Sequence, residues 1–161
     1  MNMDVNNLIK ILNRQKKLLE ELNKLAGEQL QAIKQDSPEE ITAITARQEY
    51  SARQLALLEE QRNSVIEEYS QKIGMEIKNF SELLLHLKSD DREEIKKIRD
   101  DILAECHQLD EANELNTLLL KQSLRFSEHI LEILNGRNFP VYGRSGDVHR
   151  AGGKRLVDTN V

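Results

Sequence analysis

Apolar residues spaced alternately three and four positions apart run through most of this 161-residue chain. Such spacing is that of a heptad seam, which places one apolar stripe along the length of a helix. Three long stripes predict an all-α protein whose helices pack on one another. The stripes consist of Val5, Leu8, Leu12, Gln15, Leu19, Leu22, Ala26, Gln29 and Ile33; of Ile41, Ile44, Gln48, Ala52, Leu55, Leu58, Arg62, Val65 and Tyr69; and of Ile95, Ile98, Ile102, Cys106, Leu109, Asn113, Asn116, Leu120, Ser123, Ser127, Ile130 and Leu134.

Helix-breaking residues divide the stripes from one another. Asp36 or Ser37 offers an N-cap before Pro38, Gly74 weakens the second helix, and Gly136 stands where a C-terminal glycine cap is expected. Connections this short place successive long helices antiparallel. We therefore predict an elongated antiparallel three-helix coiled-coil bundle over residues 1–135, with a short extra helix between its second and third helices and a flexible C-terminal tail. The predicted helices are 4–34, 38–72, 75–87 and 92–135, and the tail is 136–161.

Charge follows the same division of the chain. Residues 1–135 hold 18 basic and 26 acidic side chains, a net charge of −8, whereas residues 136–161 hold five and two, a net charge of +3. An acidic chain is not expected to bind nucleic acid, and no stretch has the ~18 apolar residues needed for membrane insertion. The absence of a secretory signal and the lone Cys106 favour a cytoplasmic setting. The basic tail is either a binding arm or an ordinary charged, disordered end.

Catalytic and metal-binding patterns do not occur in the sequence. A di-iron site in a helical bundle requires Glu three residues before His, and His86, His107, His129 and His149 all lack it. Cys106 and His107 are adjacent, so their side chains diverge by ~100° on a helix and cannot share a metal. Because no Gly-rich phosphate loop or activated serine is present either, we predict no enzyme, no cofactor and no metal.

The second half of the last helix is the candidate binding surface. Its apolar residues from Leu115 to Leu134 cover ~240° of the helix, and at ~1.5 Å per residue this helix is ~20 Å longer than the first. The first helix cannot cover all of it, so surplus apolar surface could accept another amphipathic helix. A closed bundle that uses the broad arc internally, with the two asparagines only fixing register, remains open. The candidate partner-binding residues are Asn113, Asn116, Leu119, Leu120, Ser123, Leu124, Phe126, Ile130, Leu131 and Leu134.

Two segments near the C-terminus resemble those of a known family. The stretch Asn113-Glu114-Leu115-Asn116-Thr117-Leu118-Leu119-Leu120-Lys121-Gln122-Ser123, followed by Phe126, Ile130 and Leu134, resembles the C-terminal helix of FlgN-type flagellar export chaperones. Val141-Tyr142-Gly143-Arg144-Ser145-Gly146 is similar to the aromatic-Gly-x-x-Gly tail of that family, and a basic run ending at Asp158 follows. With helix order included, the resemblance covers nearly the whole chain.

This resemblance implies a function. Such a protein would keep the hook-associated proteins FlgK and FlgL soluble and unassembled by binding their helix-forming terminal segments, and would deliver them to the flagellar type III export apparatus without an ATP site. It also implies that a tail aromatic, here Tyr142, docks on the export gate, although Tyr142 packing against the bundle is an alternative. A different class, a self-associating helical coiled-coil scaffold, fits the heptads equally well, and weak homodimerisation also stays open.

Overall fold

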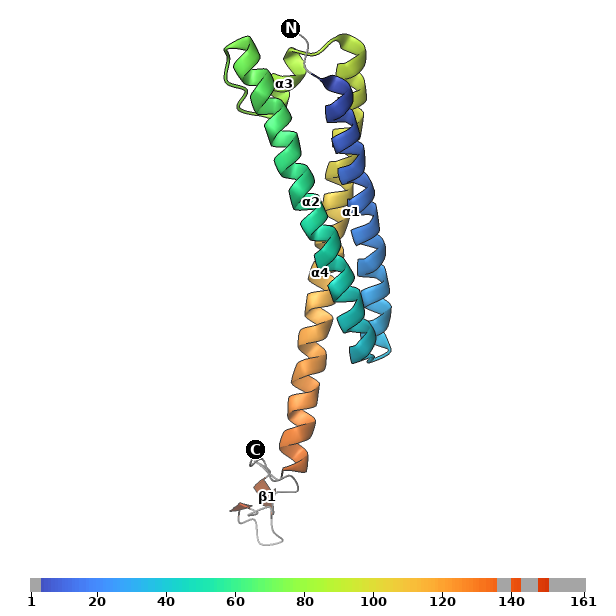
Figure 1. The fold of residues 1–161 in the computed structure, drawn as a ribbon. Helices are drawn as coiled ribbons and strands as arrows, with labels where there is room; N and C mark the ends of the chain where they lie inside the picture. The colour runs from blue at the N-terminus through green and yellow to red at the C-terminus, as the bar shows by residue number, and fades with distance from the viewer. Residues whose placement is uncertain (1–3, 136–139, 143–147, 151–161) are drawn as a thin grey trace. The chain divides into compact units, whose positions relative to one another are not determined.

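The computed structural model describes residues 4–135, 140–142 and 148–150 (Figure 1). Up to Asn135 the regular structure of the described chain is helical, which confirms the predicted all-α class. Two strands of three residues each then pair antiparallel, with Val141 opposite His149. None of the described helices is long and apolar enough to cross a membrane. The elements are α1 (Val5–Lys34), α2 (Pro38–Ile73), α3 (Phe80–Leu85), α4 (Ser89–Leu134), β1 (Pro140–Tyr142) and β2 (Val148–Arg150).

The chain divides into two compact units, Met1–Asn116 and Thr117–Val161. The sequence places the boundary later, between residues 135 and 136, where the helical pattern stops. The first compact unit ends at Asn116 because the side chains of α4 beyond it are nearly all exposed. The helix itself continues to Leu134. Apart from β1 and β2, the predicted tail 136–161 lies outside the described residues.

A tight connection joins α1 to α2. Asp36 adopts a left-handed backbone with φ of 51°, and Ser37 is the N-cap residue that precedes Pro38. Proline suits this first helical position because its missing N–H would have no partner there, and Glu39 and Glu40 face the positive end of the helix dipole. Both ends of the connection lie within one residue of their predicted positions.

The segment after α2 contains less helix than the predicted 75–87. Gly74 ends α2 with φ of 66°, a left-handed conformation that glycine adopts without a Cβ penalty. Asn79 is extended, and its side chain accepts a hydrogen bond from the Glu82 backbone N–H at 2.9 Å. The Glu82 carboxylate in turn accepts from the Lys78 N–H at 2.7 Å. This reciprocal capping starts α3 at Phe80 rather than at Met75.

Helix α4 begins at Ser89, three residues before the predicted start at Arg92. Ser89, Asp90 and Asp91 therefore belong to the first turn of the helix. Asp90 and Asp91 lie there, where carboxylates interact favourably with the exposed N–H groups of the helix. The Arg92 side chain donates back to the Leu87 carbonyl at 3.1 Å, which ties the first turn to the end of the preceding segment.

Two apolar clusters hold the unit Met1–Asn116 together. The larger joins all four helices and contains the fully buried Leu8, Leu83 and Ile95. The smaller lies near the α1–α2 connection and contains Leu25 and Ile44. In the middle of α2 the seam differs from the prediction, since Ala52 is exposed and Ser51 is buried in its place.

Polar contacts across the helices give their directions within this unit. Glu28 pairs with Arg47 at 3.0 Å close to the α1–α2 connection, so these two helices run in opposite directions (Figure 1). Lys16 contacts Asp101 at 2.7 Å, and Asn23 donates to the Glu105 carboxylate at 2.7 Å. The residue numbers of the contacting side chains increase together along both helices, so α1 and α4 run in the same direction.

The Lys16–Asp101 ion pair makes stability depend on pH. The hydrogen bond from Lys16 lowers the pKa of Asp101, and the same bond raises the pKa of Lys16. A lowered folded-state pKa means that Asp101 contributes stability above its unfolded value of 3.8 and loses it as pH falls through the folded value. Lys16 contributes below its unfolded value of 10.5 and loses this contribution as pH rises through the raised value.

We expect Asp101→Asn to lower the urea midpoint slightly at about pH 7 and by less at about pH 2.5, since exposed pairs are weak and a falling pH progressively protonates the carboxyl. Urea titrations followed by circular dichroism measure both midpoints. Asp100→Asn, at the exposed neighbouring position, is the matched control and should change neither. An equal loss for Asp101→Asn at the two pH values would contradict the ion-pair assignment.

Candidate functional site

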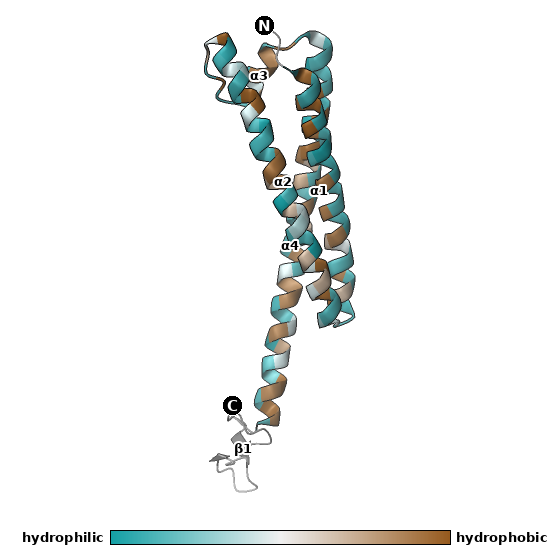
Figure 2. Ribbon diagram, viewed as in Figure 1, coloured by the Kyte–Doolittle hydropathy of each residue, from teal (hydrophilic) through white to brown (hydrophobic). Residues whose placement is uncertain are grey.

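The C-terminal part of α4 carries a long run of exposed apolar side chains. Phe126 is 67% exposed and Leu124 is 60% exposed, and the pattern continues to the end of the helix (Figure 2). Large apolar side chains are normally removed from water, so a contiguous exposed set is the candidate for a partner-binding surface. The exposed set is Leu118, Leu120, Leu124, Phe126, Ile130, Leu131, Ile133 and Leu134.

These side chains form one face of the helix. At 100° per residue they span an arc of roughly 240°, and the position of Asn116 lies inside this arc. Charged residues occupy the remaining side, with Lys121, Arg125, Glu128 and Glu132 within about 60° of one another. We call the apolar arc between Leu118 and Leu134 the α4 face.

Asn116 marks the last buried position of α4. It is 2% exposed, and its Nδ2 donates to the Ala26 carbonyl at 2.9 Å and to Gln29 Oε1 at 3.1 Å. Gln29 Nε2 lies 3.3 Å from Thr45 Oγ1 and 3.2 Å from Gln48 Oε1. A layer of side-chain amides therefore links α1, α2 and α4.

The predicted partner-binding residues differ in how exposed they are. Asn116 is buried in the layer just described and is not accessible to a partner, whereas Asn113, three residues earlier, is exposed. Leu119 is half-buried and Ser123 is exposed. Tyr142 lies in β1, and its side chain is outside the described part of the structure. The remaining six predicted residues, Leu120, Leu124, Phe126, Ile130, Leu131 and Leu134, lie together on the α4 face.

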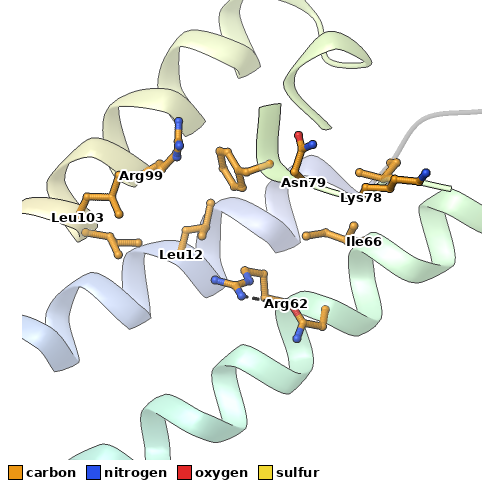
Figure 3. A pocket seen from close by; sticks show the side chains of 11 residues that line it. Leu12, Arg62, Ile66, Lys78, Asn79, Arg99 and Leu103 are labelled. Carbon is orange, nitrogen blue, oxygen red and sulfur yellow. Dashed lines mark hydrogen bonds between the residues drawn. The ribbon is translucent and has the colours of Figure 1, made fainter. Parts of the chain in front are cut away.

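A pocket of about 380 Å³ that the sequence does not predict opens within the unit Met1–Asn116 (Figure 3). It is lined from α1 by Leu12, from α2 by Arg62, from the segment before α3 by Lys78, and from α4 by Arg99. The Arg99 guanidinium lies 5.3 Å from the centre of the Phe80 ring. Periodicity alone could not reveal this pocket, because its lining comes from four separate segments.

Among the described residues, no group of three or more His, Cys, Asp or Glu side chains could hold a metal ion. His107 Nε2 and Glu111 Oε1 are 3.4 Å apart, with both side chains largely exposed. Burial raises the pKa of the Cys106 thiol, and the charges of Asp110 and Glu105 raise it further. A raised pKa favours the protonated thiol, which is a poor nucleophile.

Long packed helices and an exposed apolar helical face define a helical binding protein. Comparison with protein families identifies which one, since the family model described as FlgN protein matches residues 1–150. The chain therefore belongs to the FlgN family, whose members are flagellar export chaperones that bind flagellar export substrates. A search of curated proteins and a search of solved structures each returned no significant match.

Proposed function

We propose that this protein is a cytoplasmic chaperone that captures the helix-forming terminal segments of FlgK and FlgL on its α4 face and delivers them to the flagellar export apparatus. The observation that carries the proposal is the exposed apolar arc between Leu118 and Leu134. Amphipathic helices bind in this way, by laying their apolar side against a complementary apolar surface. A client segment bound there cannot use the same apolar side to assemble with its neighbours.

The energetics of such capture suit a reversible chaperone. Each Å² of apolar surface buried contributes roughly 25 cal/mol, and part of this gain is offset by the cost of association and of ordering the client. The α4 face already lies on a formed helix, so the chaperone side needs little further ordering. The expected result is a client complex tight enough to prevent assembly and weak enough to release.

The packing within Met1–Asn116 would serve as the support for this face. We propose that α1, α2 and α4 form an antiparallel three-helix bundle, with coiled-coil packing of the heptad seams between α1 and α2. The opposite directions of α1 and α2 and the shared direction of α1 and α4 support this arrangement. The amide layer around Asn116 and Gln29 is of the type that fixes helix register in such bundles.

Co-expression with FlgK and with FlgL tests the proposal. We expect a soluble complex of fixed stoichiometry, measured by size-exclusion chromatography with light scattering, that requires the terminal segment of the client. In the same system Tyr142→Ala is expected to leave the complex intact and reduce secretion of the client, because the tail aromatic is proposed to contact the export gate.

Two outcomes would contradict these assignments. A stable homo-oligomer that ignores FlgK and FlgL would favour the self-associating scaffold over the chaperone. Normal secretion by the Tyr142→Ala variant would remove the docking role from that residue while leaving client capture unaffected.

A further inference from the structure

The side chains that line the pocket between Leu12 and Arg99 are rich in hydrogen-bond donors and include no carboxylate. Of its eleven lining residues, three are cationic and none is acidic, although the protein as a whole carries a net charge of −5. Arg62 is partly neutralised by Glu59 at 3.3 Å. Lys78 and Arg99 supply the other two positive charges, and Arg99 also stacks on Phe80.

The two asparagines of the lining strengthen this polarity. Asn79 Oδ1 already accepts from the Glu82 N–H at 2.9 Å, and Asn63 Oδ1 already accepts from Arg62 at 3.3 Å. Each amide also carries an NH₂ group that can donate to an occupant. Carboxylate and backbone carbonyl oxygens are the acceptors that such a donor-rich site favours.

The remaining lining is apolar. Figure 3 shows Leu12 and Ile66 among these polar groups, with Arg62 on α2 and Arg99 on α4. A ligand that satisfies the whole site therefore combines a carboxylate with apolar groups. The apolar lining consists of Leu12, Ile66, Ile77, Phe80, Ile102 and Leu103.

A neighbouring hollow favours a peptide over a small molecule. It shares Asn63, Ile66 and Ile77 with the pocket, and its own lining carries Glu67 and Glu76. Two adjoining hollows of opposite charge suit an extended chain, whose acidic side chain occupies the first while a neutral or basic neighbour faces the second.

We propose that this pocket is a peptide-binding subsite for a segment of a partner protein in which an acidic residue is flanked by apolar residues. The subsite is made of residues up to Leu103 and contains none of the α4 face. It therefore does not depend on the function proposed for that face, and either assignment can fail without the other.

Titration of the full-length ¹⁵N-labelled protein with acetyl-Leu-Glu-Phe-amide tests the subsite by NMR. We expect amide shift changes centred on Ile77–Phe80 and on Ile102, with dissociation near about 1 mM for so short a probe. The Gln-centred and Lys-centred peptides of otherwise identical sequence should bind at least about threefold more weakly, since they lose the charge pairing.

Exposed lysines provide a matched pair of variants. Lys78→Gln should weaken the Glu peptide about threefold and leave the Gln peptide unchanged. Lys72→Gln, an exposed lysine outside the lining, should change neither. Equal affinities for the three peptides, shifts confined to residues 117–134, or no shifts at about 10 mM peptide would each overturn the proposal.

Discussion

Replacing Phe126 and Ile130 together with glutamate is expected to weaken binding of the FlgK or FlgL terminal segment at least about 100-fold. Each apolar side chain contributes roughly 1.5 kcal/mol or more when a client helix covers it. Each new carboxylate would also have to lose water in the complex. Isothermal titration calorimetry with the isolated client segment measures the change.

The same two substitutions should leave the fold intact. Phe126 is 67% exposed and Ile130 is 38% exposed in the free protein, so their replacement opens no cavity in the core. We expect the melting temperature to change by no more than a few degrees, as for ordinary surface substitutions. A loss of affinity accompanied by unfolding would not support the assignment, which is why both quantities are measured on one preparation.

A substitution on the opposite side of the helix serves as the control for the change in net charge. Lys121→Glu alters the net charge by two, as does the double variant, but it lies among the charged residues outside the α4 face. It should retain client affinity within about twofold, because rim charges contribute little. Equal losses for the two variants would mean that overall charge, rather than the apolar face, governs binding.

Single residues in the sequence were sufficient to predict those helix ends that depend on the backbone preference of one residue. Pro38 begins α2 and the left-handed Gly74 ends it, so both ends of α2 were predicted within one residue. The start of α3 depends on Asn79 adopting an extended conformation and accepting from Glu82, which apolar spacing does not reveal. Helical periodicity therefore overestimated that helix.

The sequence pattern does not predict which face of a helix is covered by its neighbours, and the structure was needed to show it. The heptad pattern marks Asn113 and Asn116 as equivalent seam positions, yet one is exposed and the other is buried against α1. The two positions lie about 60° apart around the helix, and periodicity does not show which of them faces α1. The pocket beside Arg99 was missed for a related reason, since its four segments are brought together only by folding.

Asn116→Ala is expected to destabilise the protein by about 2 to 3 kcal/mol. The Asn116 side chain supplies the hydrogen bonds to the Ala26 carbonyl and to Gln29 Oε1 described above, and both lie where water has little access. Removing the donor leaves these acceptors without it at a buried position. Urea denaturation followed by circular dichroism measures the free energy of unfolding.

Asn113→Ala is the matched control, because it makes the same substitution one helical turn away at an exposed position. It should change the free energy of unfolding by no more than about 0.5 kcal/mol. If the two variants were equally stable, the hydrogen bonds of Asn116 would carry no net stabilisation.

The double variant Asn116→Leu with Gln29→Leu separates stability from register. Replacing both partners with apolar residues removes the orphaned acceptor of Gln29, and the Ala26 carbonyl, inside α1, keeps its intrahelical hydrogen bond. Stability should therefore recover to near that of the unmodified protein. Thr45 keeps its bond to the Ile41 carbonyl at 2.8 Å, and half-buried Gln48 can be hydrated. A uniformly apolar seam nevertheless permits helices to slide or to add a further chain. We therefore expect near-native stability together with a mixture of oligomers or helix registers. Sedimentation detects the oligomers, and amide NMR spectra detect the registers. A single monomeric species would show that the amide layer does not select the fold.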